Sequence, residues 1–353
     1  MEAQRPGDIL IVEDDSAFLS SACLTLTRCR HGVVSCSSAE EAHNHLQRIP
    51  FDLILIGHSL PDSDGASLCQ AIKSDANLQS ISVGMLIDAA SEAAMTPDSL
   101  TGTGTGFGKE TRTSDVFAPD DYIRKDASAS ELIMRVRSLL RVRRYLEEIQ
   151  NTIGALTSFA EGAEEQDKRA RGHCKRLAII AIELGSVLKL DDWSLTTLER
   201  AGYLHDIGKT CIPGALLQKA QPLSPREMQI IQSHCVVGEK LCRGIAALNP
   251  ALPVIRHHHE RLDGSGYPDG LKGEEIPILA QVFSIVDIYE SLRLWRPYRP
   301  PLTETHTIQV MTQEVDKGYW NRKIFDLFQT HVLPGLDGRL MSQQIQWPRE
   351  GEI

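Results

Sequence analysis

The sequence lacks three features that would each define a class of protein. Basic residues do not outnumber acidic ones, and the net charge of −10 argues against a general nucleic-acid binder, because phosphate backbones attract basic surfaces. The eight cysteines form no Cys-x-x-Cys pair and read as reduced core thiols. There is no signal-peptide core, and the apolar run from Leu177 to Ile182 is too short to span a bilayer. We therefore expect a cytoplasmic protein that binds neither nucleic acid nor membrane. The net negative charge is compatible with a small anionic substrate if positive charge is gathered locally.

The N-terminal part predicts a doubly wound α/β domain over residues 5–127. Four segments separated by helical patterns read as parallel strands: 9–12, 51–56, 81–87 and 121–125. The first ends in acidic residues, which places carboxylates at the functional edge of such a sheet. A Gly-, Thr- and Ser-rich stretch between Ala89 and Phe117 predicts a mobile loop.

This domain resembles the receiver domain of bacterial response regulators, a flavodoxin-like fold. Glu13 and Asp14 match the acidic pair that holds magnesium in that family, and Lys125 matches its conserved lysine. Gly57 stands where the family carries its phosphorylated aspartate, and glycine offers no carboxylate nucleophile. Ile87 replaces the family's Thr or Ser. We therefore expect a pseudo-receiver, kept for packing or for binding a protein partner.

Residues 128–160 predict a long connecting helix. Its apolar positions recur in steps of three and four: Leu139, Val142, Leu146, Ile149, Ile153 and Leu156. This spacing fits a coiled-coil seam that would form a homodimer. It fits equally well a single amphipathic helix that packs on its own domain.

The remaining part, residues 155–340, is rich in histidine. Half of the twelve histidines fall between His173 and His259, on a mostly helical background. Where His205 and Asp206 adjoin, the imidazole can take one metal ion and the short carboxylate can bridge two. Imidazole clusters with interspersed carboxylates suit borderline metals such as iron, manganese or zinc. The pattern predicts a metal site.

The motifs of this part resemble the HD-GYP branch of the HD phosphohydrolases in order and spacing. They are His173, His205-Asp206-Ile-Gly-Lys209, His234, HHERLDGSGYPDG from His258 to Gly270, Asp287, and Arg296-Pro-Tyr-Arg299. That family is all-helical, binds two or three metal ions and hydrolyses the bacterial second messenger cyclic di-GMP. The resemblance implies a C-terminal all-α HD-type metal phosphohydrolase domain that cleaves cyclic di-GMP to pGpG and possibly GMP.

The resemblance also implies a ligand set for two divalent ions, with iron or manganese favoured and zinc or nickel as alternatives. The ligands are His173, His205, Asp206, His234, His258, His259 and Asp287. Two ions about 3.5–4 Å apart would lower the pKa of a bridging water and clamp the phosphate during in-line attack. Asp206 would bridge the ions, and Lys209 would neutralise charge on the phosphorane or the leaving oxygen.

Substrate contacts follow from the same resemblance. Arg296 and Arg299 match positions that grip phosphate, where arginine can bind two oxygens at once. Tyr267, in a glycine-flanked loop, could stack on guanine, and Asp167 is a further candidate for substrate binding.

Two positions depart from the family near the expected metal site. Arg169 replaces the glutamate that supplies a ligand to a third metal ion in some members, so two ions are expected. Glu290 replaces an aspartate and is expected to be peripheral.

Two other functions remain open from the sequence. One is a binding module with weak or absent hydrolysis, whose output is protein contact through the pseudo-receiver. The other is a phosphodiesterase for cyclic GMP-AMP, because the sequence does not set the base preference.

Overall fold

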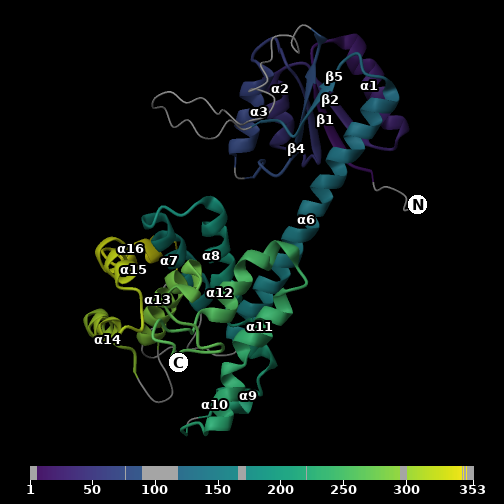
Figure 1. Ribbon diagram of the computed structural model, residues 1–353. Helices are drawn as coiled ribbons and strands as arrows, with labels where there is room; N and C mark the ends of the chain where they lie inside the picture. Colours follow the sequence, from purple (N-terminus) through teal and green to yellow (C-terminus); the bar gives the residue numbers. More distant parts are fainter. Residues whose placement is uncertain are drawn as a thin grey trace. The chain divides into compact units, whose positions relative to one another are not determined.

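The computed structural model describes residues 6–75, 77–89, 118–165, 172–219, 221–294, 300–343, 345 and 347. The chain divides into two compact units, residues 1–150 and 151–353 (Figure 1). The loop expected between Ala89 and Phe117 lies outside the described residues from position 90 onward. Among the described helices, none has the length and apolar character that a bilayer crossing needs.

The first unit contains a parallel five-stranded sheet in the order β2-β1-β3-β4-β5. The strands are β1 (Asp8–Val12), β2 (Gly32–Cys36), β3 (Leu53–Gly57), β4 (Ser82–Ile87) and β5 (Asp121–Arg124). This order is that of a doubly wound flavodoxin-like domain, which confirms the predicted fold class. The sequence did not predict β2, because this edge strand is mostly half-buried or exposed and has no continuous apolar run.

Helices cover both faces of the sheet (Figure 1). α2 (Ala39–Leu46) and α3 (Gly65–Ser74) pack on the face that carries Leu10 and Val12. α1 (Ser16–Arg28) and the first turns of α6 (Ala129–Glu165) pack on the face that carries Ile9 and Ile11. Successive residues of β1 thus serve opposite cores, as the period of two in a strand requires.

A buried ion pair lies at the carboxyl edge of this sheet. Glu13 is fully buried, and its Oε1 accepts a 2.8 Å hydrogen bond from Lys125 Nζ. Burial raises the pKa of Glu13. A Cβ added at Gly57 would lie 2.5 Å from Glu13 Oε2. The Glu13 carboxylate therefore occupies the space that a larger residue at position 57 would need.

α6 is one continuous helix of 37 residues, but its apolar positions do not share one environment. Leu139 is buried in the core of the first unit, and Ile153 and Leu156 pack in a cluster of the second. Between them, Val142, Leu146 and Ile149 are 52%, 52% and 40% exposed. Both ends of the helix therefore pack on their own units, and the expected seam is exposed only in its middle part.

The regular elements in the described part of the second unit are all helical, which confirms the predicted all-α domain. They are α7 (His173–Val187), α8 (Asp192–Leu204), η1 (Ile207–Cys211), α9 (Gly214–Leu217), α10 (Pro225–Gln232), α11 (His234–Cys242), η2 (Ala246–Ala251), α12 (Leu252–His257), η3 (Gly273–Glu275), α13 (Ile278–Arg293), α14 (Glu304–Asp316), α15 (Arg322–Leu327), η4 (Phe328–Val332) and α16 (Leu336–Ser342).

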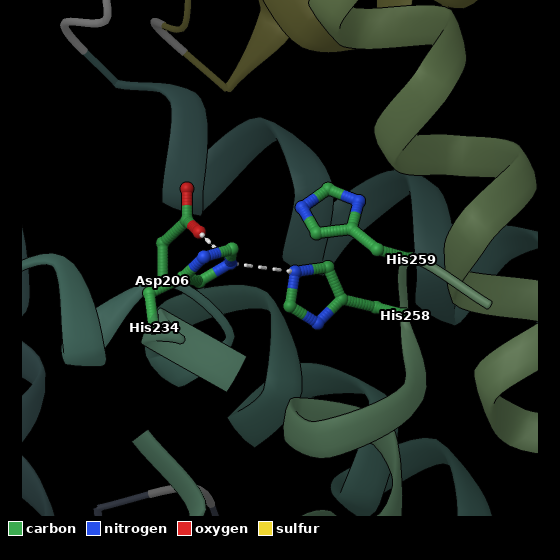
Figure 2. A group of neighbouring side chains, drawn as sticks. All are labelled: Asp206, His234, His258 and His259. Carbon is green, nitrogen blue, oxygen red and sulfur yellow. Dashed lines mark hydrogen bonds and ion pairs between the residues drawn. The ribbon is translucent and has the colours of Figure 1, made fainter. Parts of the chain in front are cut away.

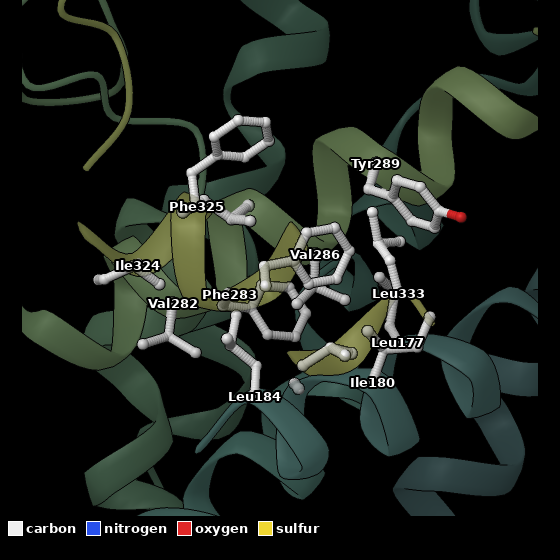
Figure 3. Packing of buried hydrophobic residues seen from close by; sticks show 14 of the residues in the cluster. Leu177, Ile180, Leu184, Val282, Phe283, Val286, Tyr289, Ile324, Phe325 and Leu333 are labelled. Atoms are coloured by element: carbon white, nitrogen blue, oxygen red, sulfur yellow. The ribbon is translucent and has the colours of Figure 1, made fainter. Parts of the chain in front are cut away.

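α7 and α13 form the centre of this unit's core (Figure 3). α7 buries Leu177, Ile180 and Leu184, whose spacing of three and four places them on one helix face. α13 is buried almost all round, including Phe283 and Tyr289. The two helices that carry His173 and Asp287 are therefore both anchored by apolar packing in this core.

Candidate metal centre

Six of the seven predicted metal ligands lie at helix ends, while Asp287 lies within α13. The six are His173 at the start of α7, His205 and Asp206 between α8 and η1, His234 at the start of α11, and His258 and His259 directly after α12. A helix with its side chains is about 10 Å across, so side chains at helix ends can converge where helix middles would keep each other apart.

These residues form two groups that could each hold a metal ion. Asp206, His234, His258 and His259 form the first group (Figure 2). His173, His205 and Asp287 form the second. Within each group, the potential ligand atoms lie within 4.8 Å of one another. The structure thus brings together all seven residues named from the sequence.

The Asp206 carboxylate directs one oxygen toward each group. Its Oδ1 lies 3.1 Å from His234 Nε2, and its Oδ2 lies 3.3 Å from His205 Nε2. Lys209 Nζ donates a hydrogen bond to Oδ2. Burial alone would raise the pKa of Asp206, but Lys209 and His205 outweigh it and hold the pKa well below its usual range. The carboxylate is therefore ionised and shared between both groups.

Backbone carbonyls set the tautomer of three histidines. The Nδ1 atoms of His205, His234 and His258 lie 3.2, 2.7 and 2.9 Å from the carbonyl oxygens three residues earlier. A carbonyl can only accept, so each Nδ1 carries a proton, and in the neutral ring the lone pair is then on Nε2. This arrangement leaves Nε2 as the ligand atom, as in metal sites whose histidines are oriented through the other ring nitrogen.

Two buried polar atoms at the centre fit the binding of a cation. His205 Nε2 and Asp206 Oδ1 have no hydrogen-bond partner among the described residues. The 3.1 Å approach of Asp206 Oδ1 to His234 Nε2 is within ion-pair range but lacks hydrogen-bond geometry. Leaving such groups buried and unsatisfied is costly, and a divalent ion in each ligand group would satisfy them. Imidazole and carboxylate donors are those that transition metals accept.

Burial also favours the neutral, metal-binding form of two candidate ligands. It lowers the pKa of His258 well below the usual value and that of His259 to about 4. Both rings are therefore neutral near pH 7, the form that binds a cation without first releasing a proton.

Gly208 allows the segment that follows His205 and Asp206 to approach α11. A Cβ at this position would lie 2.0 Å from His234 O and 2.6 Å from Gly238 N, which are backbone atoms that no rotamer change can move. Only glycine fits such an approach. The contact between η1 and α11 in turn brings Asp206 and His234 together.

The structure also assigns partners that the sequence did not predict. Glu290 is fully buried, and its two oxygens accept hydrogen bonds from His173 Nδ1 and, at 2.6 Å, from Arg176 Nε. Burial would raise the pKa of Glu290, but His173 and Arg176 outweigh it and lower the pKa to about 2. The expectation that Glu290 is peripheral was wrong, because this carboxylate orients a candidate ligand.

A spacing in the sequence could have revealed this network. Arg176 follows His173 by three residues on α7, and Glu290 follows Asp287 by three on α13. Residues three apart lie on the same helix face, so the face that carries a ligand carries its support one turn later.

The loop after His259 is pinned by a second buried carboxylate. Glu260 is 2% exposed and accepts hydrogen bonds from the backbone N–H groups of Asp269, Gly270 and Leu271. The Tyr267 ring then lies 4.8 Å from the His259 ring, centroid to centroid. His257 pairs with Asp269 at 2.9 Å and lies outside both ligand groups.

A cavity of about 350 Å³ opens over the two groups. Its walls include Lys209 and Tyr267 as well as five of the seven candidate ligands. Three predicted substrate residues, Asp167, Arg296 and Arg299, lie outside the described residues, as does Arg169.

Comparison with known families agrees with this division of the chain. Residues 157–324 match the model of the HD domain, and residues 9–101 match that of the response regulator receiver domain. The chain therefore joins a receiver domain to an HD domain.

Its curated relatives carry related activities in their names. The chain is 28% identical to a probable cyclic di-GMP phosphodiesterase of Vibrio cholerae, over 89% of this chain and 75% of that protein. It is 29% identical to the cyclic di-GMP phosphodiesterase response regulator RpfG of Xanthomonas campestris, over 52% of this chain and 54% of the relative. It is also 29% identical to 3'3'-cGAMP-specific phosphodiesterase 3 of Vibrio cholerae, over 45% of this chain and 35% of the relative. The chain thus spans about half or less of the latter two relatives.

The contact between Glu290 and His173 leads to a test by metal titration. Glu290→Gln keeps an acceptor for His173 but removes the charge, and we expect metal affinity to fall about 10- to 100-fold, as for other partners of ligating histidines. Affinity is measured by Mn²⁺ titration against a competing chelator, with thermal melting to show that the variant folds. Glu183→Gln, which changes a more exposed glutamate of α7 paired with Arg339, is the control. Unchanged affinity in folded Glu290→Gln would contradict the role.

Proposed function

We propose that this chain is a metal-dependent phosphodiesterase that hydrolyses cyclic di-GMP to pGpG, and possibly on to GMP. The observation that carries the proposal is the Asp206 carboxylate, with one oxygen directed to each of two ligand groups on the floor of one cavity. The names of the relatives support the substrate class. Hydrolysis of cyclic GMP-AMP is the second candidate, supported by the cGAMP-specific relative.

The seven ligands would hold two divalent ions, with iron or manganese as the favoured metals. When bound, the ions would supply an activated water and neutralise charge on the phosphate. Lys209 Nζ, beside Asp206 in the cavity wall, is a fixed cation for the phosphate oxygens as charge develops. Tyr267, beside His259 in the cavity wall, offers a ring for stacking on a base. Phosphate binding by Arg296 and Arg299, and substrate binding by Asp167, stay predictions.

Two substitutions separate metal binding from catalysis. Asp206→Ala removes the shared ligand, so bound metal and hydrolysis of cyclic di-GMP should be lost together. Lys209→Ala removes no ligand, so metal content should hold while turnover falls about 10²–10³-fold, the usual loss for one electrostatic donor. Elemental analysis and chromatography of the separated products measure the two effects. Lys240→Ala, at an exposed lysine of α11, is the control. Full metal occupancy in Asp206→Ala, or no turnover by metal-loaded wild type, would refute the proposal.

The receiver domain is proposed to act without phosphorylation at the usual strand end. Gly57 supplies no acceptor, and the Glu13 carboxylate paired with Lys125 fills the adjoining space. Incubation with acetyl phosphate and Mg²⁺ should therefore add no mass to the intact chain. A stoichiometric, acid-labile phosphate adduct on the first domain would show that another residue serves as acceptor.

A homodimer through the middle of α6 is the third part of the proposal. Val142, Leu146 and Ile149 are exposed at coiled-coil spacing. Light scattering should give twice the chain mass for the wild type and a monomer for the double variant Leu146→Asp and Ile149→Asp, which would bury charge in the seam. Gln150→Asp adds charge outside the seam and should stay dimeric. A monomeric wild type, or a dimeric double variant, excludes this seam.

A further inference from the structure

The cavity over the metal ligands contains a guanidinium that the proposed chemistry does not use. Arg261 lies in the loop after His259, is half-buried and lines the cavity together with Trp320. Its Cζ atom lies 4.4 Å from the centroid of the Tyr319 ring and 5.8 Å from that of Trp320. Arginine stacks in this way on aromatic faces while the N–H groups at its edge stay available.

Hydrogen bonds hold Tyr319 and Trp320, the two residues on which Arg261 stacks, in place. Leu262 N donates a 3.0 Å hydrogen bond to Tyr319 O, so the backbone beside Arg261 is tied to the turn between α14 and α15. Trp320 Nε1 donates a 2.8 Å hydrogen bond to Glu314 Oε2. The guanidinium therefore rests on two rings whose positions are set by the fold rather than by a ligand.

The hydrogen-bonding edge of Arg261 is unusual among the arginines of this region. Within the described part of the chain, its guanidinium forms no hydrogen bond and no ion pair. By contrast, Arg256 is bound through three of its nitrogens to Glu239 and Asp269. A half-buried guanidinium with a covered face and an unused edge, in a cavity wall, is suited to a planar acceptor on a ligand.

We propose that Arg261 recognises guanine in the substrate, through paired hydrogen bonds to O6 and N7 of the base. This inference rests on the proposed function, and it narrows the substrate to cyclic dinucleotides that contain guanine. Guanine presents two acceptors at this edge, whereas adenine presents a donor at N6 beside N7, so the same arginine would reject adenine. Lys209 lies beside Asp206 and is proposed to contact the phosphate oxygens. Arg261 is therefore not needed for that contact and can bind the base.

The test compares bases in binding and in turnover, with the full metal-loaded chain. GMP and AMP binding is measured by calorimetry, and kcat/KM is measured for cyclic di-GMP, cyclic di-AMP and bis(p-nitrophenyl) phosphate, which has no base. The variant is Arg261→Lys, which keeps the charge but loses the planar pair of donors. Arg322→Lys, at an exposed arginine paired with Asp316 at the start of α15, is the matched control.

The wild type should prefer GMP to AMP, and Arg261→Lys should reduce this preference about 10- to 100-fold, the range of one paired contact to a base. The loss of kcat/KM should appear mainly in KM for cyclic di-GMP and be at least ~10-fold smaller for bis(p-nitrophenyl) phosphate. Metal content and melting temperature should match those of Arg322→Lys.

Equal losses on all three substrates would overturn the inference in favour of a phosphate contact or a structural role. An unchanged GMP preference in Arg261→Lys, or wild type without such a preference, would overturn it as well. If the wild type does not hydrolyse cyclic di-GMP, the first-named function fails. A GMP preference that Arg261→Lys removes would still support guanine recognition in that case.

Discussion

The arrangement of the second unit depends on one shared carboxylate. Asp206 lies between two histidine groups and directs an oxygen to each of them. Burying these groups without a cation is costly, because polar atoms at the centre stay unsatisfied in a medium that screens charge poorly. Two ions bound on either side would turn this cost into a source of stability. We therefore propose that the candidate ligands form one dinuclear site rather than two separate sites.

Several of the candidate metal ligands are held in position by hydrogen bonds to neighbouring groups. Three histidines are oriented by the carbonyl oxygens three residues earlier, and His173 is oriented by Glu290, which Arg176 holds in turn. A side chain at position 208 would keep η1 and α11 apart, and glycine has none. Such supports matter because a metal site that is even slightly misplaced loses affinity and activity. The ligands thus owe their geometry to backbone contacts as much as to their own packing.

How much could be predicted from the sequence depended on whether a feature is local. The seven candidate ligands follow from motifs, and the structure brings all of them into two groups. Buried strands such as β1 and β3 follow from continuous apolar runs, whereas the edge strand β2 has none. The contact of Glu290 with His173 joins residues 117 positions apart, and the stacking of Arg261 on Tyr319 also joins distant segments. The α6 spacing alone did not show that its two ends pack on different units.

The central claim is that Asp206 joins two ions, and electron paramagnetic resonance of the Mn²⁺-loaded chain tests it most directly. Two ions about 3.5–4 Å apart through a carboxylate should be magnetically coupled. If Asp206 joins two ions, a coupled-pair spectrum should appear together with the second equivalent of Mn²⁺. A spectrum of isolated ions at full loading, or saturation at one ion per chain, would contradict it.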